Sequence, residues 1–324
     1  MTGFLLRRLI NYVALCLIAT FFAYSAAALT FNPLARYQMR NPPPPPEVIE
    51  NLRQELRLDE PIPLRFLHWG AGVLQGDFGE TITGQPITME LWSRVGVSLR
   101  LLLIGTTLGI VLGVALGALG AIRQYRPSDY AGTLFSFVVL STPVFLLGIL
   151  LQFAAIKFND AAGTTVLYFT GETTAGFQGG FGAALLDRLQ HLILPTIAIA
   201  FTQIALYSRY QRSAMLDVLG SDFLRTAQAK GLTRTRALFK HGLRTALIPM
   251  ATLFAFGFGL LITGSVFVEE VFAWYGMGEW FVRGVQVEDV NIVATVTLFV
   301  AVLILFSGWL SDVLYAALDP RIRL

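Results

Sequence analysis

A segment rich in Lys and Arg lies in the middle of this sequence, and its charged side chains could bind a partner. Residues 209–244 hold eight of the chain's 24 Lys and Arg, against only Asp217 and Asp222. The segment is therefore +6, whereas the whole chain is +3. Fixed positive charge of this kind recognises anionic surfaces, such as lipid headgroups or an acidic protein partner. Two short helices are predicted to present it.

The first of these helices is predicted over residues 221–231. Ser221 or Asp222 can accept hydrogen bonds from the free N–H groups at its start, and Gly231 can close it in a left-handed conformation. Ala227 and Gly231 are four residues apart, so they share a small face that another protein can approach closely. We expect this element to dock on a partner. Its assigned residues are Ser221, Asp222, Arg225, Thr226, Ala227, Lys230, Gly231 and Leu232.

A second helix can start at Thr233. Its Arg236, Lys240 and Arg244 fall at successive i, i+4 positions and form one basic stripe. Like charges at this spacing disfavour an isolated helix by a few tenths of a kcal/mol each. We therefore expect something anionic to face the stripe, either lipid headgroups or a partner protein.

Motifs for catalysis are absent from the sequence. It contains no G-x-x-x-x-G-K-[ST] phosphate loop, no H-E-x-x-H and no G-x-S-x-G. We therefore expect no catalytic residue and no nucleotide site of that kind in this chain. The histidines His68, His191 and His241 lie far apart and show no metal-ligand spacing, so no metal site is expected.

The composition places the basic segment in a membrane protein. The chain is 55% hydrophobic and 14% charged, whereas soluble domains carry roughly 25% charged residues. A helix needs roughly 20 apolar residues to cross a bilayer. The fold class predicted is an all-α polytopic membrane protein with about six transmembrane helices. The expected spans are 9–29, 97–121, 131–156, 190–208, 245–268 and 291–314.

The predicted spans lack a proton relay. Residues 131–156, 192–208, 245–268 and 291–311 contain no Asp, Glu, Lys, Arg or His. A proton-driven carrier is therefore disfavoured, whereas a sodium-driven carrier that uses neutral oxygens stays open. Neutral polar side chains in these helices either bond helices together or line a path for a polar solute. The candidates for path lining are Thr142, Gln152, Gln203, Thr263 and Ser265.

The distribution of Lys and Arg in the short loops predicts that both termini lie in the cytoplasm. The first span is expected to remain as an uncleaved helix, and a cleaved signal peptide is the alternative. The expected organisation is an N-terminal transmembrane helix (1–30), an extracytoplasmic segment (31–96), a five-helix core (97–317) whose cytoplasmic loop is at about 209–244, and a cytoplasmic tail (318–324).

Local patterns add three expectations about packing. Residues 47–61 have helical periodicity, and residues 76–86 are Gly-rich and turn-like. In the second span, glycines recur at every fourth position and let another helix approach closely. These glycines are Gly105, Gly109, Gly113 and Gly117.

Several motifs, taken together and in order, resemble one family. They are "LLRRLI", "GDFGETITGQPI", "RLQHLILPTIAIA", "MLDVLGSDFLRTAQAKGL", "VFVEEVF" and "DVLYAALDPRIR". Over nearly its whole length the chain resembles permeases of the binding-protein-dependent ATP-binding-cassette (ABC) importers, in the dipeptide, oligopeptide and nickel branch. The general importer pattern has Glu-Ala-Ala where Arg225-Thr226-Ala227 stands here, and the peptide branch commonly has this Arg-Thr-Ala form.

The resemblance implies a type I ABC importer permease fold and a first-permease, or B-type, subunit in the cell (inner, cytoplasmic) membrane. The segment around "RTAQAKG" would be the coupling loop seated in an ATPase. Implied partners are a second homologous permease, two ATPase subunits or one fused ATPase, an extracytoplasmic solute-binding protein and membrane lipid, but no nucleic acid. ATP and Mg would bind the ATPase subunits and not this chain.

The implied function is ATP-driven import of di- or oligopeptides. Nickel, haem and glutathione importers look similar at this level, so these cargoes stay open. Two readings from other classes also stay open. One is a stand-alone carrier driven by an ion gradient, and the other is a membrane scaffold without a transport role.

Overall fold

The described part of the chain consists of helices joined by loops. This structure is a computed structural model that describes residues 2–39, 41–42 and 44–318, without the side chains of 2–9, 36, 252, 255–264 and 314–318. Those residues contain no β-strand, and one isolated bridge joins Glu80 to Pro86. Contacts divide the chain into two compact units. Unit 1 is Met1–Val97 with Gly276–Leu305, and unit 2 is Ser98–Tyr275 with Phe306–Leu324.

Unit 1 contains α1 (Thr2–Thr30), α2 (Ala35–Gln38), α3 (Pro46–Glu55), α4 (Ile62–Leu74), the start of α5 (Ile87–Ile122), α12 (Met277–Gln286) and the start of α13 (Val290–Leu318). Aromatic rings join α1 to α4, because the Tyr24 ring centroid lies 5.6 Å from that of Phe66 and 5.9 Å from that of Trp69. The first turns of α13 pack on the same cluster through Val290, Val293 and Ala294. Aromatic and aliphatic burial therefore fixes α4 against α1.

The helix expected over residues 47–61 is shorter than the periodicity indicated. α3 begins at Pro46, a favoured first helical residue, and ends at Glu55. Arg57 then adopts a left-handed conformation with φ 51°, which stops the helix. A further helix, α4, follows from Ile62, and the sequence patterns above did not indicate it.

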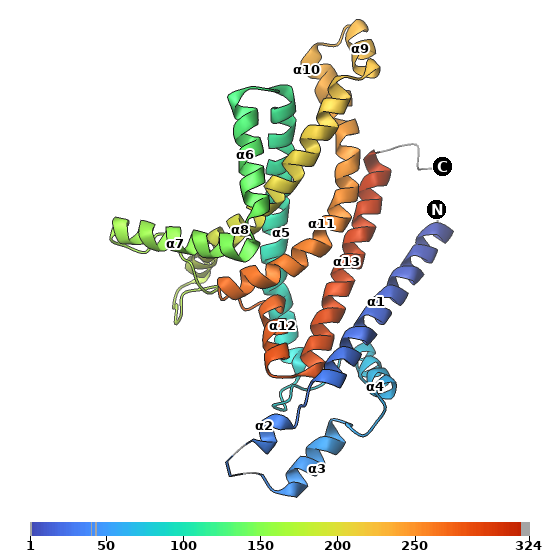
Figure 1. Cartoon of the computed structure of the whole chain (residues 1–324), viewed down its shortest axis with the longest axis vertical. Helices are drawn as coiled ribbons and strands as arrows, with labels where there is room; N and C mark the ends of the chain where they lie inside the picture. The colour runs from blue at the N-terminus through green and yellow to red at the C-terminus, as the bar shows by residue number, and fades with distance from the viewer. Residues whose placement is uncertain (1, 40, 43, 319–324) are drawn as a thin grey trace. The chain divides into compact units, whose positions relative to one another are not determined.

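Five helices of the described residues are long and apolar enough to cross a membrane (Figure 1). They are Ile10–Thr30, Ile87–Ile122, Val144–Ala162, Phe181–Leu219 and Val290–Val313. The expected span 245–268 lies within α11 (Leu243–Val271), where the side chains of 255–264 are outside the described residues. The prediction of a multi-pass all-α protein is confirmed.

The expected single span 131–156 is wrong. The structure has two helices there, α6 (Pro127–Ser141) and α7 (Val144–Ala162), which run crosswise to each other (Figure 1). Pro143 cannot donate a main-chain hydrogen bond and pushes the residue before it out of the helical region. Thr142 accordingly is extended, with φ −96° and ψ 123°. The 15-residue α6 is too short to span a bilayer by itself.

Unit 2 is built around α8 (Phe181–Leu219), which packs against α6, α7 and α11. The glycine ridge of α5 also lies on α8, as expected for close helix packing. A Cβ added at Gly109 would lie 2.5 Å from the Gln203 Cβ atom, and one at Gly117 would lie 2.4 Å from the Ser208 carbonyl oxygen. These separations admit only glycine, so the ridge sets the distance between α5 and α8.

Candidate functional site

The basic segment begins in the last turns of α8, and its residues 221–242 fold as a helical element between α8 and α11, at one end of unit 2 (Figure 1). It consists of α9 (Asp222–Ala229), α10 (Arg234–Ala237) and the π-helix η1 (Leu238–Gly242), which continues into α11. We call residues 221–244 the docking element. Short links connect it directly to both long helices, α8 and α11.

The start of α9 differs from the expected cap. Ser221 has the extended conformation of a capping residue, but its side chain makes no cap hydrogen bond. Instead the Ser221 hydroxyl donates to the Val218 carbonyl oxygen at 2.6 Å. Asp222, in the first turn, forms an exposed ion pair with Arg225 at 3.5 Å, and such exposed pairs add little stability.

The end of α9 matches the expectation. Gly231 has φ +89°, a conformation that glycine adopts without steric cost. Its N–H donates to the Gln228 carbonyl at 2.9 Å, and the Leu232 N–H donates to the Ala227 carbonyl at 3.2 Å. These two bonds form a Schellman motif. The next helix, α10, begins after Thr233 as predicted, and the Thr233 hydroxyl caps it by accepting from the Arg236 N–H at 3.3 Å.

An apolar cluster holds α9 against its neighbours. Leu224 is 3% exposed and packs with Met215 and Val218 of α8 and with Leu238 of η1. Burial of such a side chain stabilises by about 1.5–3 kcal/mol. Gly242 allows the close contact, because a Cβ there would lie 3.1 Å from Leu238 Cδ1. The docking element is therefore a fixed part of unit 2.

The face that Ala227 was expected to share with Gly231 is only partly accessible. Ala227 is half-buried and packs against the same apolar cluster, because it lies three residues after Leu224 on one side of α9. The exposed side of the helix carries Thr226 and Ala229, opposite Leu224. The accessible small residues of the docking element are therefore Thr226, Ala229 and Gly231.

The basic stripe is exposed at all three positions, Arg236, Lys240 and Arg244. The prediction that these residues follow one regular α-helix is wrong. The π-helix Leu238–Gly242 interrupts the α-helical register between Arg236 and Arg244. Sequence patterns also missed Phe239, which is 63% exposed and lies between the first two basic residues. The surface is therefore mixed, with cations beside an aromatic ring.

The five candidate path residues have different surroundings. The Gln152 amide donates to the carbonyls of Phe169 and Val271, both at 2.8 Å. The Thr142 hydroxyl donates to the Val138 carbonyl at 2.7 Å. Gln203 is 4% exposed against the α5 glycines, and Ser265 is 4% exposed. The Thr263 side chain lies outside the described residues. The Gln152 contacts favour helix bonding over path lining.

Buried ionisable residues flank the predicted spans, and their partners could not be inferred from local sequence. Asp129 accepts two hydrogen bonds from Arg212, at 2.6 and 2.8 Å, and joins α6 to α8. These bonds lower the pKa of Asp129 below its ordinary value. Asp187 accepts from the N–H and hydroxyl of Thr174, and Glu269 accepts from the Ser98 hydroxyl. These carboxylates therefore tie helices and loops together.

No metal site is evident in the part of the chain that the structure describes. Its residues contain no group of three His, Cys, Asp or Glu side chains that could hold a metal ion. The arrangement of the docking element instead suits protein recognition, because small residues and cations are presented on a fixed helical support.

The long apolar helices define a multi-pass membrane protein, and an exposed helical element lies between α8 and α11. The chain belongs to the family of binding-protein-dependent transport system inner membrane components, whose profile matches residues 109–324. It is 55% identical to the oligopeptide transport system permease protein OppB of Mycobacterium tuberculosis (strain ATCC 25618 / H37Rv), over 100% of this chain and 99% of the relative.

Two more distant relatives extend the comparison. The oligopeptide transport system permease protein AppB of Bacillus subtilis (strain 168) is 36% identical over 85% of this chain and 84% of the relative. The glutathione transport system permease protein GsiC of Salmonella choleraesuis (strain SC-B67) is 32% identical over 100% of this chain and 99% of the relative. The family is therefore shared, whereas the named cargoes differ.

Proposed function

We propose that this chain is the first, B-type permease subunit of an ATP-driven importer of di- or oligopeptides. It would form the path across the inner membrane with a second homologous permease. Two ATPase subunits, or one fused ATPase, would bind and hydrolyse ATP with Mg, and an extracytoplasmic binding protein would deliver the cargo. Family membership supports the importer, and the oligopeptide permeases at 55% and 36% identity support the cargo.

The single observation that carries the coupling role is the exposed face of α9 on a fixed base. Thr226 and Ala229 are accessible, whereas Leu224 on the opposite side is anchored to α8 and η1. An ATPase that holds this face can push or pull α9, and the apolar cluster passes the displacement to α8 and α11. This arrangement separates the site of hydrolysis from the transport path.

The test places a large side chain on that face without disturbing the anchor. Ala229→Trp is expected to leave the chain folded in the membrane, while peptide uptake by the complete reconstituted transporter falls by about tenfold or more, since ~1.4 kcal/mol of docking free energy corresponds to tenfold. Ala161→Trp is the matched control, because Ala161 is also exposed but lies near the end of α7. Equal uptake in the two variants would count against the coupling role.

Glutathione import is the second candidate, because GsiC is related over its whole length. Competition between labelled oligopeptide and glutathione for uptake separates the two cargoes. A carrier driven by an ion gradient would instead transport in vesicles that hold this chain alone, with a gradient and no ATP. The proposal predicts no uptake under those conditions.

A further inference from the structure

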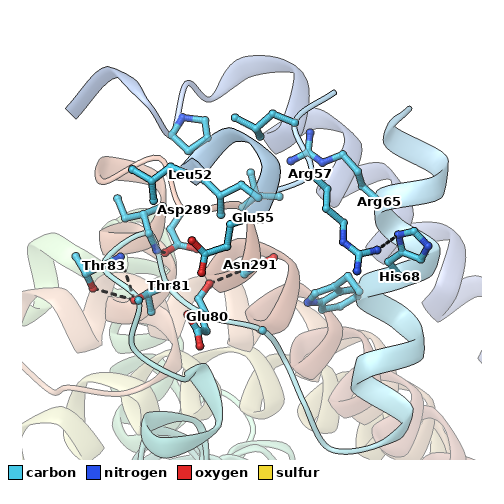
Figure 2. A pocket seen from close by; sticks show the side chains of 18 of the residues that line it. Leu52, Glu55, Arg57, Arg65, His68, Glu80, Thr81, Thr83, Asp289 and Asn291 are labelled. Carbon is cyan, nitrogen blue, oxygen red and sulfur yellow. Dashed lines mark hydrogen bonds between the residues drawn. The ribbon is translucent and has the colours of Figure 1, made fainter. Parts of the chain in front are cut away.

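A cavity of about 510 Å³ lies within unit 1 (Figure 2). Its wall is formed by α3 and α4, by the loop at residues 77–84 and by the start of α13. This volume falls within the roughly 300–1,000 Å³ of small-ligand sites. In the proposed orientation the cavity opens on the outer side of the membrane.

One side of the cavity is cationic. Figure 2 shows Arg57, Arg65 and His68 together at this side. Glu60 is the carboxylate that pairs with the group in the described chain, 3.0 Å from His68 Nδ1 and 4.0 Å from Arg57 Nη1. The Arg57 guanidinium and the His68 ring thus share one carboxylate, and Arg57 Nη1 also contacts His68 Nδ1. The Arg65 Nε atom is also buried without a hydrogen-bond partner among the described residues, so Arg65 keeps one N–H donor that no described group accepts.

Arg57 occupies a conformation that its side chain does not favour. Its φ of 51° places it at the left-handed position after α3, which is usually glycine. The Schellman bonds are present, because the Leu58 N–H donates to the Arg53 carbonyl at 3.0 Å and the Arg57 N–H donates to the Gln54 carbonyl at 3.0 Å. A non-glycine residue here costs roughly 1–2 kcal/mol. A use for the guanidinium in the cavity would offset that cost.

The other side of the cavity is acidic. Glu55 and Glu80 are exposed, and the structure records no ion pair between either of them and another described residue. Figure 2 shows both away from His68, on the side of the view where Asp289 is labelled. Asp289 is 1% exposed and is already used, because it accepts from the Ile82 N–H at 2.7 Å and the Ile292 N–H at 3.0 Å. Glu55 and Glu80 are therefore the carboxylates available to a ligand.

We propose that this cavity binds a short zwitterionic peptide. Its carboxylate end would bind Arg57 and Arg65, and its ammonium end would bind Glu55 and Glu80. Opposite charges on two sides of one cavity complement a chain whose ends carry opposite charges, and charge-assisted hydrogen bonds to guanidinium are strong. The choice of a peptide as the ligand rests on the proposed function. With this site, the permease itself would recognise the free ends of a peptide.

The test measures binding of tri-alanine to the full-length chain in lipid nanodiscs by calorimetry. Arg57→Gly is the first variant, since glycine suits the left-handed conformation and the fold should persist. We expect it to raise the Kd for tri-alanine by about tenfold or more, as for loss of a hydrogen bond to a charged group. Amidation of the peptide's carboxyl end should raise the Kd of the unmodified chain by the same factor as Arg57→Gly does. In Arg57→Gly itself, amidation should change the Kd little further.

The acidic side has its own variant, Glu80→Gln. It should weaken tri-alanine binding, and N-acetylation of the peptide should reproduce that loss. Arg53→Gln is the matched control, because Arg53 is an exposed cation on α3 outside the cavity and should leave the Kd unchanged. Absence of binding to the unmodified chain, or equal Kd values for free and blocked peptides, would overturn the proposal.

Two outcomes separate this inference from the proposed function. Normal peptide uptake by the complete transporter together with no binding by this chain would refute the cavity site and leave the importer intact. Failure of the complete transporter to import peptides would refute the cargo. A third result, in which Arg57→Gly loses only its binding of the solute-binding protein, would assign the cavity to protein docking and overturn the peptide site.

Discussion

Gly117→Ala tests the close packing of α5 on α8. A Cβ at this position would lie 2.4 Å from the Ser208 carbonyl oxygen, 2.8 Å from Gln211 Cβ and 3.0 Å from the Arg212 nitrogen. Two of these atoms are main chain, so no side-chain rotation relieves the clash and the helices must separate. Overpacking of this kind typically costs about 1–3 kcal/mol.

Gly96→Ala on the same helix is the matched control, because a Cβ at Gly96 meets no atom within 4 Å. Both variants gain the higher helix propensity of alanine, about 0.8–1 kcal/mol. The difference between them therefore isolates the packing cost, and we expect Gly117→Ala to be the less stable by about 2 kcal/mol. Equilibrium unfolding in detergent measures it. Equal stability of the two variants would refute the argument that the glycines set the helix separation.

Three further predictions concern single contacts. Asp129→Asn should lower the free energy of unfolding by about 2 kcal/mol, below the 3–5 of a fully buried pair because Arg212 is partly exposed. Because Arg212 lowers the pKa of Asp129, this contribution should be present above the ordinary value of 3.8 and be lost as pH falls below it, which pH-dependent unfolding will check. Gly231→Ala should cost about 1–2 kcal/mol through its left-handed conformation, seen as faster hydrogen exchange in α9, whereas unchanged exchange would contradict it. Gln152→Leu should cost about 1–3 kcal/mol in unfolding assays and leave peptide selectivity unchanged; altered selectivity would instead support path lining.

The end of α9 and the start of α10 could be predicted from the sequence. Gly231 and Thr233 act through neighbouring main-chain groups, so their residue types are enough to place the ends of α9 and α10. The direction of Ala227 could not be predicted, because it depends on the cluster formed with Met215 and Leu238. The close approach of Gly242, in the π-helix, to Val218 of α8 likewise joins residues of different elements.

Longer-range features were not accessible to single-sequence reasoning. The apolar run through 131–156 predicted one helix, whereas Pro143 divides it into α6 and α7. The proline is visible in the sequence, but the continuous apolar composition was given more weight. The pairing of Asp129 with Arg212 joins residues 83 positions apart. The charged cavity also joins α3 and α4 to residues near Asp289, so only the fold brings its two sides together.

The proposed importer requires an ATPase subunit to bind the exposed face of α9. The direct measurement is cross-linking in the assembled transporter, with a short thiol-to-amine reagent and a chain in which Cys16 is replaced by serine. Thr226→Cys and Ala229→Cys should each form a covalent product with the ATPase, whereas Ala161→Cys on α7 should not. If neither α9 variant cross-links while the ATPase remains bound to the complex, or if Ala161→Cys cross-links equally well, the claim is contradicted.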